Sequence, residues 1–301
     1  ICEVLPRSFL LEIPPAKSVL QLILRLTLIS AADLPELGEI RILRILNTGK
    51  RCYATQLLLA DHAQLALTRP GAVEAWFAAQ RPAVVILAAA RVGGIQANQG
   101  RPADFIRDNL LIQSNVIDAA LRFGAKKLLF LGSSCIYPRD CPQPIVEEAL
   151  LTGPLEPTNQ WYAIAKIAGL KMCQAYRRQH AFDAIAVMPT NLYGSDDDFD
   201  LENSHVLPAL LRKAHEAKER GEQQLAVWGS GTPRREFLHV DDLAEAALFV
   251  MDNYSGEMAL NVGCGEDISI RELAELICNV TGFEGRLAFD TSKPDGTPRK
   301  L

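Results

Sequence analysis

Residues 132–166 carry a hydroxyl, a thiol, a phenol and an ammonium group, which together could move protons on a carbonyl compound. Tyr162 and Lys166 lie four positions apart, so on a helix both side chains project from one face. An ammonium group beside a phenol favours the phenolate, and we therefore expect the pKa of Tyr162 to be lowered toward neutrality. The Ser133 hydroxyl could bind the same carbonyl oxygen from the other side. This pattern predicts acid–base chemistry at a carbonyl.

A predicted buried strand must hold the hydroxyl and thiol groups. The apolar run Lys127–Leu131 ends at Gly132, which is typical of such a strand. Open α/β sheets bind ligands at the carboxyl ends of their strands, and Ser133 and Cys135 follow at that end. A single serine at the end of a strand is often only a helix cap. A Tyr–Lys pair at this spacing, taken by itself, is often only part of a solvated helix face. The combination, in this order, favours the functional interpretation.

The surrounding chain alternates apolar strands with longer helices. We expect strands at 83–90, 127–132 and 184–188, and helices at 102–123 and from Tyr162 to about His180. Such alternation predicts an α/β fold with a Rossmann-like, doubly wound parallel sheet.

After Gly194 the pattern changes to a smaller second lobe. An acidic loop at 195–203 precedes a predicted helix at 207–221 and a short strand at 225–228. Ser269 and Glu272 form a capping-box pattern that opens a helix ending near Thr281.

Bulk composition excludes several function classes. The chain has 301 residues and a net charge of −5, which gives no electrostatic reason to expect nucleic acid or an anionic membrane as partner. The apolar stretch at 18–30 contains Arg25 and is too short to span a bilayer. The seven cysteines of the chain are scattered and show no closely spaced pairs of the kind that bind a metal ion. We therefore expect no metal site and a reduced, cytoplasmic setting. The adjacent Asp241 and Asp242 are interpreted as helix caps.

These motifs resemble the extended short-chain dehydrogenase/reductase family. The resemblance is carried by Gly-Ser-Ser-Cys-Ile-Tyr-Pro at 132–138 and by Tyr162 with Lys166. Further matching stretches lie at 88–95, 155–159, 188–194, 203–206, 228–233, 235–242 and 293–300. The chain is most similar to the branch that epimerises GDP-4-keto-6-deoxy-D-mannose at C3 and C5 and reduces it at C4 with NADPH.

The resemblance implies a role for each matching residue. The C4 oxygen would be stabilised and protonated by Tyr162, with help from Lys166 and Ser133. The acid/base pair for epimerisation would be Cys135 and His205. Implied cofactor contacts are Ala88, Leu131, Gly132, Ser133, Ser134, Lys166, Pro189, Thr190, Asn191, Leu192 and His205. Implied GDP-sugar contacts are Lys213, Trp228, Arg235 and Asp295, with Arg235 clamping the pyrophosphate through its planar fork.

The first residues depart from the family pattern. Members open with a strand, a Gly-x-x-Gly-x-x-Gly turn and a helix that hold the cofactor pyrophosphate. Residues 1–56 contain only Gly38 and Gly49, and the strand-like 26–29 leads into a turn at 30–35 without glycine. The segment is a misread or frame-shifted stretch, a divergent start that binds cofactor differently, or a lost cofactor site. The abrupt return of the resemblance near Leu57 favours the first.

The resemblance also implies the organisation of the chain. We expect an NADP-binding domain at 1–194 that also receives 237–254, and a substrate-binding lobe at 195–301 that is truncated at its end. A homodimer is implied as well. Two alternatives stay open: another nucleotide-sugar epimerase or dehydratase of this family, and a non-catalytic sugar-nucleotide-binding remnant.

Overall fold

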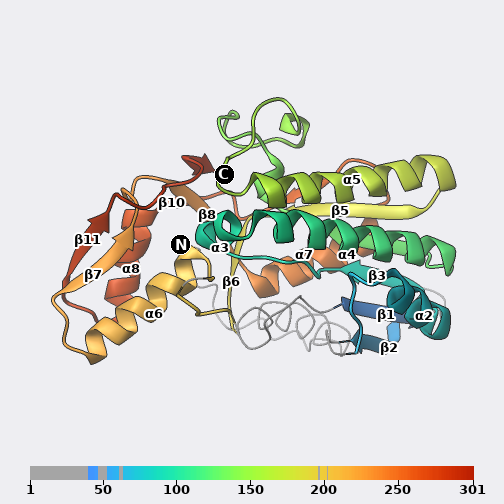
Figure 1. Cartoon of the computed structure of the whole chain (residues 1–301), viewed down its shortest axis with the longest axis horizontal. Helices are drawn as coiled ribbons and strands as arrows, with labels where there is room; N and C mark the ends of the chain where they lie inside the picture. Colours follow the sequence, from blue (N-terminus) through green and yellow to red (C-terminus); the bar gives the residue numbers. More distant parts are fainter. Residues whose placement is uncertain (1–39, 47–52, 61–63, 196, 202) are drawn as a thin grey trace.

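The computed structural model describes residues 40–46, 53–60, 64–195, 197–201 and 203–301 (Figure 1). The strand expected at 26–29 and the turn expected at 30–35 lie outside the described residues. Within this part of the chain, no helix is long and apolar enough to cross a membrane.

A six-stranded sheet forms the larger part of the molecule. Its strand order is β2 (Tyr53–Ala60), β1 (Ile40–Leu46), β3 (Val84–Leu87), β4 (Lys127–Leu131), β5 (Asp183–Pro189) and β9 (Leu260–Val262). The last four strands are parallel, which confirms the predicted parallel sheet for them. β1 runs antiparallel to both of its neighbours, which the prediction did not include.

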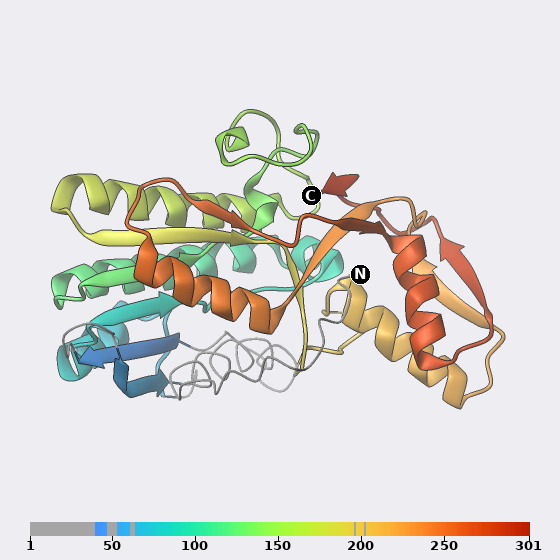
Figure 2. The same ribbon diagram turned by 180° about the vertical axis from the view of Figure 1, so that it is seen from behind.

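Helices cover both faces of this sheet. On one face lie α2 (Pro70–Gln80), α4 (Pro102–Arg122) and α5 (Gln160–His180), and on the other lies α7 (Val240–Asn253), seen in front of the sheet in Figure 2. Alternate residues of β4 serve the two faces: Leu128 packs in the core under α4 and α5, and Leu129 in the core under α7. β4 is therefore buried on both sides, which explains its unbroken apolar sequence.

Helix α5 lies very close to the sheet and to α4. The Gln113 side chain of α4 donates a hydrogen bond to the Ala165 carbonyl over 2.6 Å. A Cβ atom at Gly169 would lie 2.5 Å from the Phe130 ring of β4. This close approach sets α5 at a fixed height above the carboxyl end of β4.

The remaining elements form two smaller sheets at one end of the molecule. β7 (Gln224–Trp228) pairs in parallel with β11 (Arg286–Asp290), and α6 (Val206–Glu219) and α8 (Ile270–Thr281) pack beside them. β8 (Arg234–His239) pairs with β6 (Asn191–Tyr193), β10 (Asp267–Ser269) and β12 (Arg299–Lys300). The predicted capping box of Ser269 and Glu272 is confirmed. Short helices occur at α3 (Ile95–Gly100), η1 (Ser134–Ile136) and η2 (Glu147–Ala149).

Candidate functional site

The carboxyl end of β4 presents the predicted hydroxyl and thiol groups. After Leu131 the chain passes through Gly132, where a Cβ atom would lie 2.2 Å from the Met188 sulfur. A larger residue here would therefore displace the end of the Met188 side chain on β5. The Ser133 hydroxyl then accepts a hydrogen bond from the Cys135 backbone N–H over 3.3 Å, which caps the short helix η1.

Lys166 projects from α5 toward this strand end. Its ammonium group donates a hydrogen bond to the Leu131 carbonyl over 2.7 Å and lies 5.8 Å from the centre of the Tyr162 ring. The side chain is 3% exposed, and burial lowers its pKa to about 7. Burial therefore favours the neutral amine over the ammonium form of Lys166.

The pKa of Tyr162 differs from the sequence-based prediction. Burial raises it above its ordinary value, a charge on Cys135 acts in the same direction, and the Ser133 hydroxyl opposes the rise. The prediction that Lys166 lowers it was wrong, because the ammonium group is directed at the Leu131 carbonyl and desolvation dominates. At neutral pH Tyr162 is a protonated phenol and so a proton donor.

Cys135 accepts two hydrogen bonds through its sulfur. The Asn159 side-chain amide and the Lys300 ammonium group each lie 3.2 Å from the sulfur. Burial alone would raise the pKa of this thiol, but Lys300, Ser133 and Arg235 outweigh it and lower the pKa. A thiol with a lowered pKa can exchange protons near neutral pH.

His205 stands at the start of α6, which begins one residue before the helix predicted at 207–221. It is the residue that precedes the first turn of this helix. Desolvation by surrounding groups lowers its pKa, the charge of Lys300 acts in the same direction, and Asp198 opposes both. Lys300 thus acts on both members of the predicted acid/base pair.

The four residues expected to bind a GDP-sugar fall into two contacting pairs. The Lys213 ammonium group lies 4.4 Å from the centre of the Trp228 ring, and Lys293 approaches the same ring to 4.9 Å. Arg235 donates a hydrogen bond to the Asp295 carbonyl over 3.3 Å. The Asp295 carboxylate in turn accepts hydrogen bonds from the backbone and hydroxyl of Ser230.

The remaining predicted residues follow the ends of adjacent parallel strands. Ala88 follows β3, Ser134 lies in η1 after β4, and Pro189 ends β5. The Thr190 hydroxyl and Asn191 amide both donate to the Glu236 carbonyl of β8, so Thr190, directly after β5, ties the end of the large sheet to β8. Leu192 packs in the core beneath α7.

Sequence reasoning missed Lys300 and Asn159 as partners of Cys135. Each lies in a stretch that carried the resemblance, but Lys300 is far from Cys135 in sequence and meets it only through the pairing of β12 with β8. Neither residue stands in a local pattern that predicts contact with a thiol.

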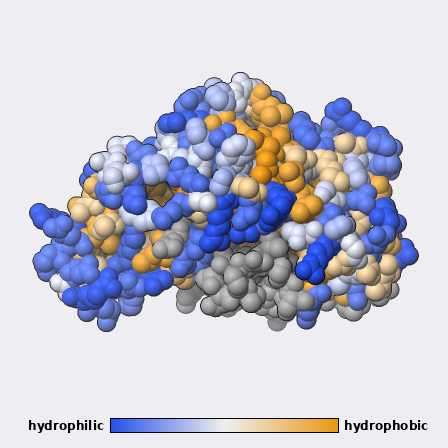
Figure 3. Space-filling model, viewed as in Figure 1, coloured by the Kyte–Doolittle hydropathy of each residue, from blue (hydrophilic) through white to orange (hydrophobic). Residues whose placement is uncertain are grey.

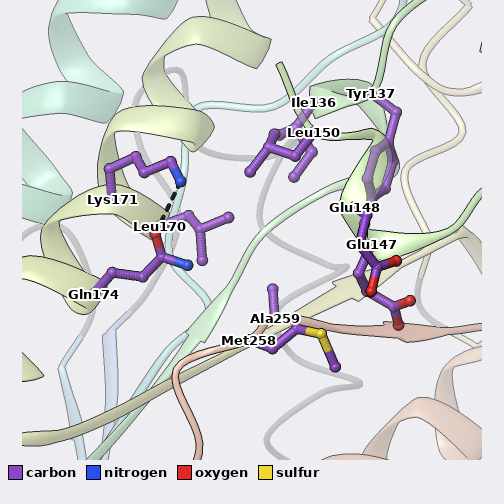
Figure 4. A pocket seen from close by; sticks show the side chains of 10 residues that line it. All are labelled: Ile136, Tyr137, Glu147, Glu148, Leu150, Leu170, Lys171, Gln174, Met258 and Ala259. Carbon is purple, nitrogen blue, oxygen red and sulfur yellow. Dashed lines mark hydrogen bonds between the residues drawn. The ribbon is translucent and has the colours of Figure 1, made fainter. Parts of the chain in front are cut away.

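Two other features lie apart from this cluster. A pocket of about 200 Å³ lies between η2, α5 and the segment before β9, and none of the predicted site residues lines it (Figure 4). Asp241 and Asp242 occupy the first turn of α7. In the described part of the chain, no group of three or more His, Cys, Asp or Glu side chains could hold a metal ion.

Comparison with known proteins agrees with this geometry. The model of the NAD dependent epimerase/dehydratase family matches residues 36–263. The chain belongs to this family. Among its epimerase/dehydratase relatives, the probable GDP-L-fucose synthase 1 of Oryza sativa is 64% identical, over 82% of this chain and 76% of the relative. The putative GDP-L-fucose synthase 2 of Arabidopsis thaliana is 65% identical over 82% of this chain and 75% of the relative.

A solved epimerase/dehydratase-type structure is similar as well. The GDP-L-fucose synthetase of Naegleria fowleri bound to NADP is 31% identical, with a TM-score of 0.72 over 81% of this chain and 75% of that one.

Proposed function

We propose that this protein converts GDP-4-keto-6-deoxy-D-mannose to GDP-L-fucose, by epimerisation at C3 and C5 followed by NADPH-dependent reduction at C4. The observation that carries the proposal is the placement of the Cys135 thiol beside Ser133 and Tyr162 at one strand end. A thiol of lowered pKa suits proton exchange at carbon, and a phenol suits protonation of an oxygen. The identity to GDP-L-fucose synthases supports the choice of substrate.

Epimerisation needs a group that removes a proton beside the C4 ketone and a group that returns one on the opposite ring face. Cys135 and His205 serve these two roles, because both exchange protons near neutral pH. The enolate oxygen that forms at C4 is stabilised by hydrogen bonds from Ser133 and Tyr162. The same two donors then serve the second stage.

NADPH, when bound, supplies the hydride for C4, and Tyr162 donates its proton to the C4 oxygen. The residues present fit the nicotinamide end of this cofactor. The carboxyl ends of β3, β4 and β5 are adjacent. Lys166 donates one hydrogen bond to Leu131, and the other N–H groups of its ammonium form suit a ribose hydroxyl. Residues expected to hold the pyrophosphate lie outside the described part of the chain.

The GDP-sugar would bind across the smaller sheets. Lys213 and Lys293 lie beside Trp228, and Arg235 contacts Asp295, so positive charge and an aromatic ring suited to a pyrophosphate and a flat base come from the same lobe. The proposed division is an NADP-binding domain at 1–194 with 237–254 and a substrate-binding lobe at 195–301, except that β9, which pairs with β5, belongs to the sheet of the first domain.

Two further parts of the proposal concern assembly and location. Exposed apolar side chains on α5 and the adjoining loop, Trp161, Ile164, Val146 and Leu151, support a homodimer. Figure 3 shows apolar surface over this part of the molecule. Scattered cysteines without disulfides among the described residues support a cytoplasmic location.

The test supplies GDP-4-keto-6-deoxy-D-mannose in deuterated water and follows two signals. We expect deuterium at C3 and C5 of the sugar without NADPH, and GDP-L-fucose with oxidation of NADPH when it is added. Deuterium absent from both carbons would contradict the epimerase assignment.

The absence of the glycine-rich turn from residues 1–56 favours one second candidate, a sugar-nucleotide-binding protein without hydride transfer. Titration with NADPH, followed by cofactor fluorescence, separates the two. Saturable binding at micromolar concentration supports the reductase, and no binding by the folded chain supports the second candidate.

A further inference from the structure

Lys300 is a buried lysine that donates a hydrogen bond to a cysteine sulfur. It lies on β12, which pairs with β8 at Arg235, and it is 8% exposed. The next residue, Leu301, is held by hydrogen bonds to Gln143 and Ile145 in the loop before η2. The Lys300 ammonium group is thereby fixed 3.2 Å from the Cys135 sulfur.

The charge of Lys300 requires a compensating anion. A buried ammonium group is costly unless it is paired. No carboxylate within the described ranges forms an ion pair with Lys300, whereas the other buried or half-buried cations at this edge contact carbonyl or carboxylate oxygens. The group at hydrogen-bond distance from Lys300 that can become an anion is the Cys135 thiol.

The surroundings of the sulfur point the same way. Asn159 donates a second hydrogen bond to it, so the sulfur is an acceptor for both polar neighbours. Arg235 adds a second positive charge, and Ser133 and Tyr162 are the neutral hydroxyl groups that face it. His205 lies within the electrostatic influence of Lys300 but carries no negative charge.

We propose that Lys300 is a positioning residue that holds Cys135 as a thiolate in the resting protein, ready to accept a proton during epimerisation. The thiol proton leaves to solvent, and Lys300 remains a protonated ammonium group. The role of this thiolate in epimerisation rests on the proposed function, but the ionisation of Cys135 by Lys300 does not. Lys300 acts through Cys135 and takes no part in binding NADPH.

The first experiment measures the thiolate without any substrate. The rate of Cys135 alkylation by iodoacetamide is followed by peptide mass spectrometry from pH 5 to pH 10, which separates it from the exposed Cys264. In Lys300→Met we expect alkylation at pH 7 to slow by about tenfold or more, since one pKa unit changes the thiolate fraction tenfold. Lys300→Arg should keep most of the rate, and the exposed-surface control Lys126→Met should match the unaltered protein.

An unchanged alkylation profile in Lys300→Met would overturn the proposal, as would an equal loss in Lys300→Arg, which keeps the charge. If Lys300→Met does not fold, a titration of the Cys135 thiol in the unaltered protein tests the proposal instead. Its thiolate absorbance at 240 nm, less that of Cys135→Ser, should titrate below about pH 8.5, the ordinary thiol pKa. A midpoint at or above that value refutes the proposal.

The second experiment separates this proposal from the proposed function. In Lys300→Met we expect deuterium exchange at C3 and C5 to fall by about tenfold or more, with the NADPH dissociation constant unchanged. Exchange absent from the unaltered protein would refute the proposed function and leave the thiol measurements valid. Normal exchange in Lys300→Met would refute the role of Lys300.

Discussion

The Lys166 ammonium group is hydrogen-bonded to the Leu131 carbonyl over 2.7 Å, at the last residue of β4. This bond joins the helix that carries Tyr162 to the strand end that carries Ser133. Lys166 therefore fixes the position of Tyr162 relative to Ser133, the two residues whose hydroxyl groups are expected to contact one carbonyl oxygen. Lys166 positions the site in addition to its expected contact with cofactor.

The depressed pKa of Lys166 predicts a pH dependence of stability. Its pKa is about 7 in the folded protein and near 10.5 when unfolded, so the unfolded chain binds more protons between these values. The free energy of unfolding should therefore rise with pH from about 7 to 10, by up to about 1.4 kcal/mol per pH unit from this group. Chemical denaturation at pH 7, 8 and 9 measures it. Lys166→Met is the reference, and an equal slope in that variant would show that another group is responsible.

Cys135→Ser should abolish most epimerisation but keep cofactor binding. A serine hydroxyl does not ionise near neutral pH, so the base at this position is lost, and we expect exchange at C3 and C5 to fall by about 10²–10⁴-fold. Nuclear magnetic resonance of the sugar in deuterated water measures exchange. A normal exchange rate in Cys135→Ser would show that another group removes these protons, whereas no exchange in the unaltered protein would favour a different nucleotide-sugar enzyme, which needs no base at these carbons.

Tyr162→Phe should impair the reductive stage. The ring and its packing are kept, but the phenolic proton is lost, and we expect NADPH oxidation with substrate to slow by about 10²–10⁴-fold. Thermal unfolding serves as the control for folding. A turnover number of Tyr162→Phe within a few-fold of that of the unaltered protein would contradict the assignment of Tyr162 as the proton donor.

Arg235→Lys should weaken substrate binding more than it slows chemistry. Lysine keeps the charge but cannot form the two parallel hydrogen bonds of a guanidinium group. We expect KM for the GDP-sugar to rise on the order of tenfold with a nearly unchanged kcat. Steady-state kinetics give both values, and a fall in kcat alone would place Arg235 at the reacting atoms instead.

The fold was predictable where the pattern was local. Apolar runs at 127–131 and 184–188 gave β4 and β5 within a residue or two, because both strands are buried on both faces. The strand expected at 83–90 is shorter, Val84–Leu87, since pairing with β4 ends at Leu87. The antiparallel β1 was not predictable from strand propensity, because direction depends on the connections between strands.

The candidate site was predictable only in part. Helical spacing brings Tyr162 and Lys166 to one face, but it does not show that Lys166 turns to a backbone carbonyl or that burial outweighs its charge at Tyr162. The contact between Lys300 and Cys135 depends on the pairing of strands from distant parts of the chain. Such contacts follow from tertiary structure, and no local periodicity indicates them.

Trp228 lies close to two lysines, Lys213 and Lys293, and 39% of its surface is exposed. The chain has three tryptophans, and Trp228 is the one at the proposed GDP-sugar contacts. A ligand that draws these ammonium groups away from the indole, or stacks on it, alters the electric field around the ring. We therefore expect the intrinsic emission of Trp228 to change when the proposed nucleotide-sugar site fills, which would report occupancy without a label or a coupled reaction.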